Sequence, residues 1–201
     1  MLKRLIDIGF SFLGLIILLP IFLVVALAIL LQDGKPVFFR QKRVGLNGQD
    51  FSILKFRTMT CTPEAEKHRF DPGSLRRVTK IGRLLRNTKL DELPQLWNVL
   101  AGDMSLVGPR PEVQRWVEVY PERWAIVHKV RPGITDPASI EFRNEEEMLA
   151  GNSNPEEAYR HQILPKKLDL YENYVRTQSF IGDFSLILKT ILVVVKKSAN
   201  K

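Results

Sequence analysis

Two adjacent carboxylates, Asp91 and Glu92, are the residues of this 201-residue chain that are best placed for chemistry. They precede Pro94, which has no backbone N–H to donate and therefore fits only the first turn of a helix. We expect this helix to run through Leu100, with Asp91 or Glu92 as its cap. Free N–H groups at a helix start favour anions, so a carboxylate there could act beside a bound phosphate. Taken alone, the pair also fits an ordinary N-cap followed by a solvated acid.

Basic residues are concentrated in the part of the chain that leads to this pair. Residues 1–90 contain 16 Lys and Arg against 6 Asp and Glu, whereas residues 91–201 contain 14 against 16. The first part is therefore predicted to meet phosphates, anionic lipid or nucleic acid. The single cysteine, Cys61, excludes an internal disulfide and is compatible with a reducing compartment. Glycine-rich phosphate loops and zinc-ligand spacings are both missing from the sequence.

The stretch from Leu5 to Leu31 is almost wholly apolar and predicts a membrane segment. As one straight helix of about 27 residues it would reach about 40 Å, which exceeds the ~30 Å hydrocarbon core. Lysine and arginine flank it on both sides, and positive flanks mark the cytoplasmic face. Pro20 would bend a helix near its middle. We therefore expect residues 1–33 to form a re-entrant membrane helix broken at Pro20, with a single-pass anchor as the alternative.

A β-hairpin is predicted directly after this segment. Val37–Val44 and Phe51–Met59 are rich in strand formers, and a turn containing two glycines joins them. Because side chains alternate along a strand, Lys55 and Arg57 should project from the same face. This pair of cations is typical of a ligand site, but equally of an edge strand guarded by charge.

The remainder predicts helices and loops. The expected elements are a loop over Thr60–Gly73, a basic amphipathic helix from Leu75 to Arg86, an aromatic segment over Glu112–His128, an acidic loop over Glu145–Asn154, a helix over Pro155–Tyr174, and an apolar segment over Phe184–Lys197 that either packs or contacts a surface. The aromatic side chains suit either the protein core or a bilayer interface. Together these patterns predict a mostly helical α+β fold: a small cytoplasmic domain over residues 34–201, with a β-hairpin and interfacial amphipathic helices, anchored by the N-terminal re-entrant hairpin.

With these residues assembled, the chain resembles the bacterial sugar transferases known as monotopic phosphoglycosyl transferases over nearly its whole length. The motifs that carry the resemblance are the apolar entry with its central proline, Lys55-Phe56-Arg57-Thr58-Met59, Arg77-Val78-Thr79-Lys80-Ile81-Gly82, Leu90-Asp91-Glu92-Leu93-Pro94-Gln95-Leu96, Gly102-Asp103-Met104-Ser105, Gly108-Pro109-Arg110-Pro111 and Arg131-Pro132-Gly133-Ile134-Thr135. The resemblance implies transfer of a sugar-1-phosphate from a UDP-sugar to a polyprenyl phosphate, such as undecaprenyl phosphate, with release of UMP. It places the enzyme at the bacterial inner membrane, with its catalytic domain on the cytoplasmic face.

The resemblance also implies Mg²⁺ and an Asp-Glu dyad. Asp91 matches the nucleophile and metal ligand, and Glu92 matches the partner that orients the dyad or the metal. Transfer of a phosphoryl group between two anionic partners also needs fixed cations. The candidates for binding phosphate oxygens are Lys55, Arg86, Arg110 and Arg143, with Arg131 as a weaker one.

Two departures from the family pattern bear on these expectations. Leu19 precedes Pro20, where relatives often have serine, and Asp136–Asn144 replaces a glycine-containing run. The second region is expected to shape the sugar or nucleotide pocket, so the identity of the sugar does not follow from the resemblance. The implied partners are the donor, the lipid acceptor, membrane lipid and downstream glycosyltransferases, but not nucleic acid. A non-catalytic membrane-anchored binding module for glycan-assembly partners and a hydrolase acting through Asp91 are the alternative functions.

Overall fold

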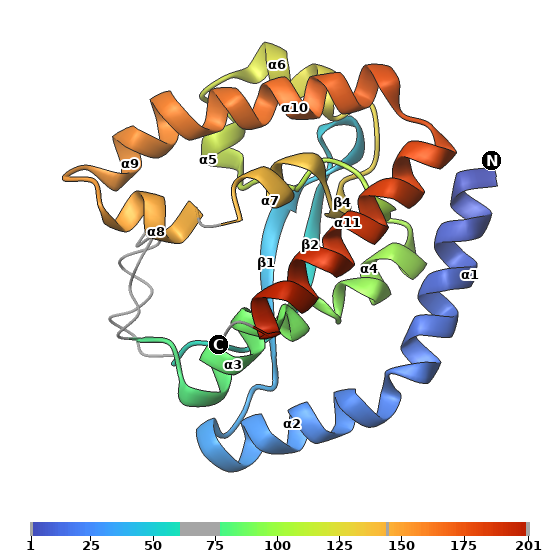
Figure 1. The fold of residues 1–201 in the computed structure, drawn as a ribbon, viewed down its shortest axis with the longest axis vertical. Coiled ribbons are helices and arrows are strands. Elements are labelled where there is room, and N and C mark those ends of the chain that lie inside the picture. The colour runs from blue at the N-terminus through green and yellow to red at the C-terminus, as the bar shows by residue number, and fades with distance from the viewer. Residues whose placement is uncertain (1, 61–76, 144, 200–201) are drawn as a thin grey trace.

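A β-hairpin lies at the centre of the molecule, with helices around it (Figure 1). Strand β1 (Phe38–Val44) pairs antiparallel with β2 (Asp50–Phe56), and their register places Phe39 opposite Lys55. The turn between them contains a short 3-10 helix over Leu46–Gly48. The predicted hairpin is therefore confirmed.

The computed structural model describes residues 2–60, 77–143 and 145–199. Over these ranges the chain is mostly helical with small sheets, which confirms the α+β class. The loop predicted over Thr60–Gly73 lies outside the described residues except for Thr60 itself, as does Leu75 at the start of the predicted basic helix.

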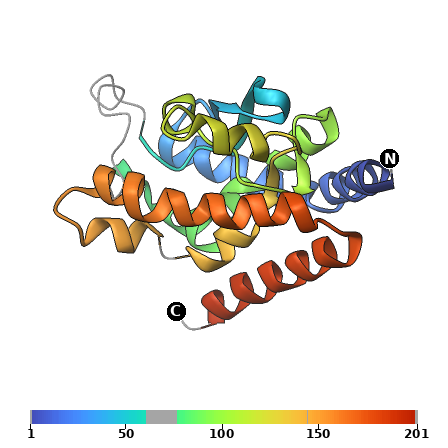
Figure 2. The same cartoon turned by 90° about the horizontal axis from the view of Figure 1, so that it is seen from above.

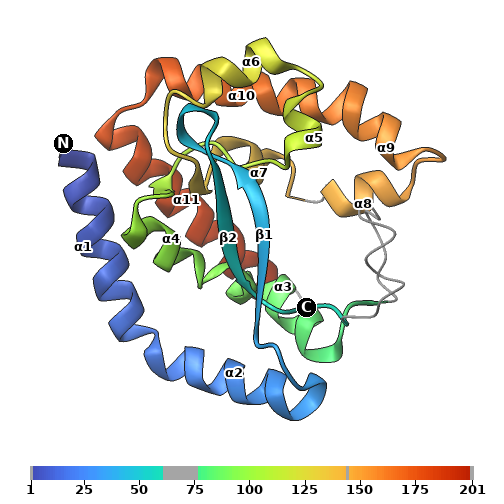
Figure 3. The same ribbon diagram turned by 180° about the vertical axis from the view of Figure 1, so that it is seen from behind.

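Helices α1 (Leu2–Ile17) and α2 (Leu19–Asp33) form a bent pair along the border of the molecule (Figures 1 and 3). Their axes differ by 59° at the break, and Pro20 lies in the first turn of α2. Among the described helices none qualifies by itself as a membrane span, but this bent pair has the length and composition of a broken span or a re-entrant loop.

Both ends of this helix pair are attached to the same domain. Arg4 donates to the Val99 carbonyl at 2.6 Å, and Asp7 accepts from the Leu106 N–H at 3.1 Å. At the other end, Arg57 donates to three carbonyls in the segment that leaves α2. Arg57 lies beyond the last residue of β2, so it does not share a strand face with Lys55 as predicted.

Helix α3 (Lys80–Thr88) presses against the hairpin. Thr79 caps it by accepting from the Gly82 N–H at 2.9 Å, so the helix begins later than the sequence pattern predicts. A Cβ at Gly82 would overlap the backbone of Thr58, and glycine therefore permits this close approach. Leu85 completes a small core with residues of α2 and β2 (Val25, Ile29 and Phe56).

The second half of the chain forms a helical layer that contains the largest core cluster, seen at the top of Figure 1 and from above in Figure 2. Its elements are α5 (Gln114–Val117), α6 (Pro121–Val127), α7 (Pro137–Glu141), α8 (Glu145–Ala150), α9 (Pro155–Ala158), a π-helical turn (Tyr159–Ile163) and α10 (Leu164–Thr177). Trp116 and Trp124 are buried in this cluster, so they pack in the core instead of facing a bilayer. The loop predicted over Glu145–Asn154 is wrong in its first half, because α8 forms there.

Two short parallel strands, β3 (Ser105–Val107) and β4 (Gly133–Thr135), join the halves. The last helix, α11 (Phe180–Ala199), crosses the molecule beside them and begins four residues before the predicted apolar segment. Many of its large apolar side chains are exposed: Phe180, Ile181, Phe184, Leu188, Ile191 and Leu192.

Candidate active site

The dyad lies on a short helical turn between α3 and α4 (Gln95–Ala101). Lys89 ends α3 in the left-handed conformation, with φ of 59°, and thereby redirects the chain. Leu90–Glu92 then form one 3-10 turn that contacts β2. The prediction that a carboxylate caps the following helix is wrong, because α4 begins only at Gln95 and both carboxylates lie one turn earlier. Their environment therefore comes mainly from side chains on other elements.

Glu92 is held by two cations. Its Oε1 accepts from Lys55 Nζ at 2.8 Å and from Arg110 Nη2 at 2.5 Å, and its Oε2 accepts from Arg110 Nη1 at 3.2 Å. Burial alone would raise the pKa of Glu92, but the charges of Arg110 and Lys55 outweigh burial and hold this pKa well below its usual range. Glu92 in turn raises the pKa of Arg110. Glu92 is thus ionised at neutral pH and has no proton to exchange.

Asp91 has a different environment, although it is the next residue. It is buried, and its Oδ1 has no hydrogen-bond partner among the described residues. Burial raises the pKa of Asp91, the charge of Glu92 raises it further, and the opposing charges of Lys55, Lys89 and Arg86 do not cancel this rise. Among the described residues, Asp91 therefore keeps a carboxylate oxygen that no hydrogen bond holds in place.

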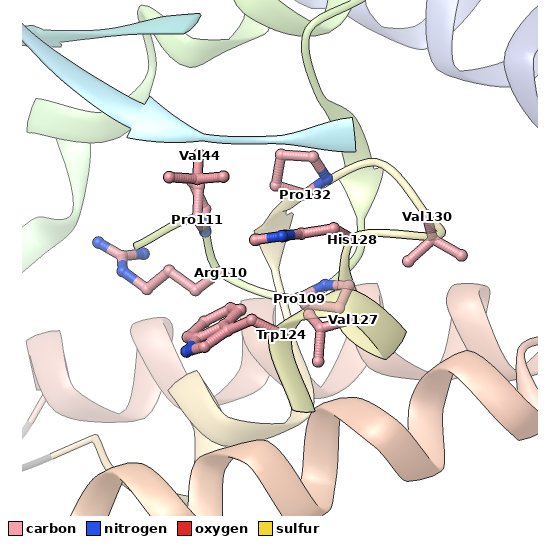
Figure 4. A pocket seen from close by; sticks show the side chains of 9 residues that line it. All are labelled: Val44, Pro109, Arg110, Pro111, Trp124, Val127, His128, Val130 and Pro132. Carbon is pink, nitrogen blue, oxygen red and sulfur yellow. The ribbon is translucent and has the colours of Figure 1, made fainter. Parts of the chain in front are cut away.

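Arg110, the second cation on Glu92, lies at the edge of a small cavity. Its neighbours Pro109 and Pro111 line this cavity together with His128 and Trp124, whose rings stack with centroids 5.3 Å apart. Figure 4 shows the Arg110 guanidinium pointing away from these two rings. The cavity measures about 10 Å³, enough for about one water molecule, so it has no room for a sugar or a nucleotide. A second cavity, of about 240 Å³ between α10 and α11, contains no residue of the dyad.

The structure brings a third predicted cation, Arg86, to the dyad. Arg86 Nε donates to Thr58 Oγ1 at 3.1 Å, and its charge lowers the pKa of Asp91. Arg86 thus acts on Asp91 through its charge, whereas Lys55 and Arg110 contact Glu92 directly.

The other two predicted cations are not joined to the dyad. Arg131 Nε donates to the Gly102 carbonyl at 2.8 Å and thereby links the segment before β4 to the turn after α4. Arg143 is exposed in the turn after α7, and no hydrogen bond or ion pair in the described part of the chain connects it to either carboxylate. Their proposed roles in phosphate binding stay predictions.

Two charged residues near the dyad were missed. The charge of Lys89 lowers the pKa of both Asp91 and Glu92, although no pattern in the sequence signals its left-handed conformation. Asp136 is fully buried, caps α7 by accepting from the Ser139 N–H at 2.8 Å, and raises the pKa of Arg110. The sequence motif Asp-Pro-x-Ser could have predicted the cap, but not the proximity to Arg110.

The fit of Mg²⁺ to these residues rests on Asp91. Its Oδ1 is an unpartnered acceptor, and a hard cation prefers oxygen ligands. Both oxygens of Glu92 already accept from Lys55 and Arg110, and the described residues contain no cluster of three or more metal-ligating side chains. The residues therefore fit an ion that takes one protein carboxylate and completes its shell with phosphate and water oxygens, as Mg²⁺ often does.

A buried carboxylate dyad with four neighbouring cations, beside a bent apolar helix pair, is suited to anionic substrates. Comparison with known proteins assigns this arrangement to a family. Residues 1–197 match the family model described as bacterial sugar transferase. The chain is 39% identical over 196 residues to the UDP-glucose:undecaprenyl-phosphate glucose-1-phosphate transferase of Caulobacter vibrioides. This match covers 94% of the chain and 68% of that protein.

Two further relatives support the same assignment. The uncharacterized sugar transferase EpsL of Bacillus subtilis is 46% identical over 143 residues, covering 71% of this chain and 70% of that protein. A UDP-glucose:undecaprenyl-phosphate glucose-1-phosphate transferase of Klebsiella pneumoniae is 39% identical over 193 residues, although the chain spans only 39% of its length. The chain thus belongs to the bacterial sugar transferase family and is a phosphoglycosyl transferase.

Proposed function

We propose that this enzyme transfers a sugar-1-phosphate from a UDP-sugar to undecaprenyl phosphate or a similar polyprenyl phosphate. Relatives named for this reaction with UDP-glucose support the substrate classes. The observation that carries the proposal is the unequal partnering of two adjacent buried carboxylates: Glu92 is fully engaged by cations, whereas Asp91 keeps an unpartnered oxygen.

In the proposed first step, a carboxylate oxygen of Asp91 attacks the phosphorus that carries the sugar. The new bond joins this oxygen to phosphorus, and the bond to the bridging oxygen breaks, so that UMP leaves with the electron pair. In the second step, an oxygen of the polyprenyl phosphate attacks the same phosphorus and releases Asp91 as a carboxylate. The raised pKa of Asp91 supports this role, because a more basic carboxylate is a better nucleophile.

The charge balance around the dyad supports a diphosphate as substrate. Four cations, namely Lys55, Arg86, Lys89 and Arg110, act on the two carboxylates. With both carboxylates of the dyad ionised, four positive and two negative charges leave a balance of +2 before the substrate binds, or +1 when Asp136 beside Arg110 is ionised too. Bound Mg²⁺ would add positive charge at the phosphate oxygens through Asp91. This excess of positive charge favours an anionic ligand next to the two buried carboxylates.

We also propose that α1 and α2 form a re-entrant membrane hairpin on the cytoplasmic face of the bacterial inner membrane. The hydrogen bonds of Arg4, Asp7 and Arg57 hold the start of α1 and the end of α2 against one domain. A helix that crossed the bilayer would place its two ends about 30 Å apart on opposite faces. The large apolar residues that α1 and α2 expose support contact with lipid: Leu2, Leu5, Ile8, Phe10, Phe12, Leu13, Ile16, Ile17, Leu19, Ile21, Leu23, Val24, Leu27, Leu30 and Leu31.

A donor screen tests the proposed reaction. Protein in mild detergent is mixed with a panel of UDP-sugars, Mg²⁺ and undecaprenyl phosphate, and UMP is measured. We expect release with at least one donor and loss of about 10³-fold or more in Asp91→Asn, because the amide cannot act as nucleophile. With donor alone, mass spectrometry should detect one phosphosugar on the peptide that contains Asp91. Asp103→Asn, in the turn after α4, is the matched control and should not remove the adduct.

The lipid acceptor separates transfer from hydrolysis. Under the proposal, omitting undecaprenyl phosphate limits UMP to about one equivalent per enzyme, whereas a hydrolase would continue to turn over. Unlimited release without lipid would contradict transfer, and full activity of Asp91→Asn would contradict the covalent step.

Site-specific labelling tests the membrane topology. In a Cys61→Ser background, single cysteines replace Lys3 or Gly34, and intact cells are treated with a reagent that does not cross the inner membrane. We expect protection of both positions until the membrane is permeabilised. Labelling of one position alone in intact cells would establish a through-going helix.

A further inference from the structure

Gln95 has a buried side chain that the proposed mechanism does not yet use. It is the first residue of α4 and is 1% exposed. Its amide nitrogen, Nε2, is buried and has no hydrogen-bond partner among the described residues. A buried donor without a partner destabilises the folded chain, and an apolar side chain of the same size would avoid this penalty. Such a group indicates a partner that arrives from outside the protein.

The backbone places Gln95 beside the dyad. Leu93 and Pro94 have right-handed helical dihedral angles, so the helical path continues from the 3-10 turn into α4. Residues three and four apart on such a path share a face, so Gln95 is next to both Glu92 and Asp91. Both oxygens of Glu92 already accept from cations, and Asp91 is therefore the neighbour of Gln95 that keeps an unpartnered oxygen.

The two unpartnered atoms on this face differ in kind. Gln95 Nε2 is a donor, and Asp91 Oδ1 is an acceptor, yet they are not bonded to each other. An anionic group that Asp91 attacks would bring acceptor oxygens to this face, and the Gln95 amide is a neutral donor without a partner there. Two of the cationic donors at the dyad, Lys55 and Arg110, already contact Glu92.

Building on the proposed function, we propose that Gln95 is a further catalytic residue, whose Nε2 donates to a non-bridging oxygen of the phosphoryl group that Asp91 attacks. The bond strengthens as negative charge gathers on this oxygen in the transition state. No proton is transferred: the P–O bond to Asp91 forms, the P–O bond to UMP breaks, and the amide keeps both hydrogens throughout. The ligand recognised is a phosphoryl group of the donor, regardless of which sugar it carries.

The test compares two buried amides in the same helix. Gln95→Met removes the unpartnered donor at nearly constant size. Asn98→Leu is the matched control, because Asn98 donates to the Ser52 carbonyl at 2.8 Å and accepts from the Leu54 N–H at 2.9 Å. We measure the melting temperature in detergent, kcat and KM for UMP release, and the single-turnover rate of adduct formation with donor alone.

We expect Gln95→Met to keep or raise the melting temperature, while kcat and the rate of adduct formation fall about 10²-fold with little change in KM. Asn98→Leu should lower the melting temperature, with an adduct rate per folded molecule that falls much less. Gln95→Glu, which keeps the size but places an anion beside the phosphoryl group, should lose at least as much activity as Gln95→Met.

Other outcomes are equally informative. If Gln95→Met retains wild-type kcat, the inference is overturned, because the amide then has no role in catalysis. If Gln95→Met melts at as low a temperature as Asn98→Leu or fails to fold, the inference is also overturned, because the amide is then structural. If the wild type is active, Asp91→Asn is inactive and Gln95→Met is unimpaired, only the role of Gln95 is refuted. If the wild-type protein releases no UMP from any donor, the proposed function itself is refuted.

Discussion

The ion pair between Arg110 and Glu92 provides a quantitative test of how the dyad is built. We consider Arg110→Met, which keeps an unbranched apolar stem and removes the guanidinium with its charge. In the native protein this guanidinium makes two hydrogen bonds to Glu92, and the side chains of Arg110 and Glu92 are 27% and 11% exposed. The substitution therefore leaves a mostly buried carboxylate whose remaining cationic contact in the described part of the chain is Lys55.

The size of the effect follows from burial. Removing one partner of a buried pair costs about 3–5 kcal/mol. Because Lys55 stays in place and Arg110 is partly screened by solvent, we expect the low end, about 3 kcal/mol. For a chain of this size, that loss lowers the melting temperature by about 6–12 °C. The exposed pair Arg176–Glu172, with Arg176 69% exposed, is the control, and Arg176→Met should cost less than about 1 kcal/mol.

The assay is a double-mutant cycle followed by thermal melting in detergent. Glu92→Gln alone leaves two buried cations without their anion and should cost a similar amount. For independent sites, the double variant would lose about 6 kcal/mol, whereas for this contact pair we expect about 4 kcal/mol or less. Additive losses would refute the argument that the two side chains stabilise one another.

The pH dependence of this loss has a definite sign. Glu92 has a pKa well below its usual range in the folded protein, so its ionisation stabilises the fold above the unfolded pKa of about 4.3. This contribution disappears as pH falls through the folded pKa. Arg110→Met raises the folded pKa, so the difference between wild type and variant should be full above about pH 5 and narrow below it. A difference that widened in acid would contradict the assignment.

Three further predictions concern the surroundings of the dyad. The acid limb of the pH profile of kcat/KM should titrate above the ordinary aspartate pKa of about 3.9, because burial raises the pKa of Asp91. Added Mg²⁺ should move this limb to lower pH. An acid limb that Mg²⁺ does not move would argue against ligation of the ion by Asp91. Gly82→Ala should lower the melting temperature by several degrees, because the Cβ of alanine would overlap the backbone of Thr58. For a chain of this size, each kcal/mol lost lowers the melting temperature by about 2–4 °C. An unchanged melting temperature would show that α3 can shift away from Thr58. Lys89→Ser should raise KM for the donor severalfold at low salt, because the charge of Lys89 acts on both carboxylates. The effect on KM should be smaller at high salt, because salt screens exposed charges. An effect on KM that does not depend on salt would indicate a conformational cause.

Local signals in the sequence predicted the hairpin and the helices well. Two glycines between segments of strand formers fix a turn, and the apolar spacing that includes Ile81 and Leu85 fixes a helix whose buried side packs on β2. The helical start was less predictable. Thr79, not a residue near Leu75, caps α3, because the preceding residue Val78 forms an antiparallel bridge with Met59. That bridge joins residues 19 positions apart, and local periodicity carries no information about it.

The candidate site could be predicted only in part for the same reason. The dyad and three of the four cations near it, Lys55, Arg86 and Arg110, were named from the sequence, but the way in which they divide between the two carboxylates depends on contacts across the fold. Lys55 and Arg110 reach Glu92 from positions 37 and 18 residues away. Arg131 is bonded to the Gly102 carbonyl instead, and the left-handed turn at Lys89 has no sequence signature. The sequence can thus predict that a basic residue binds an acceptor, but not which acceptor the fold brings to it.

The unequal surroundings of the two carboxylates explain how adjacent acids can serve one reaction. If both carboxylates had the same contacts with the cations, their pKa values would be similar and neither carboxylate would be the distinct nucleophile. Here Lys55 and Arg110 engage Glu92, which keeps it an anion and fixes the cations in place. Its negative charge then acts on Asp91 from the next residue and, together with burial, raises the pKa of Asp91. Glu92 therefore serves the proposed reaction twice: it anchors the cations that the phosphates need, and it makes the neighbouring carboxylate more basic and more nucleophilic.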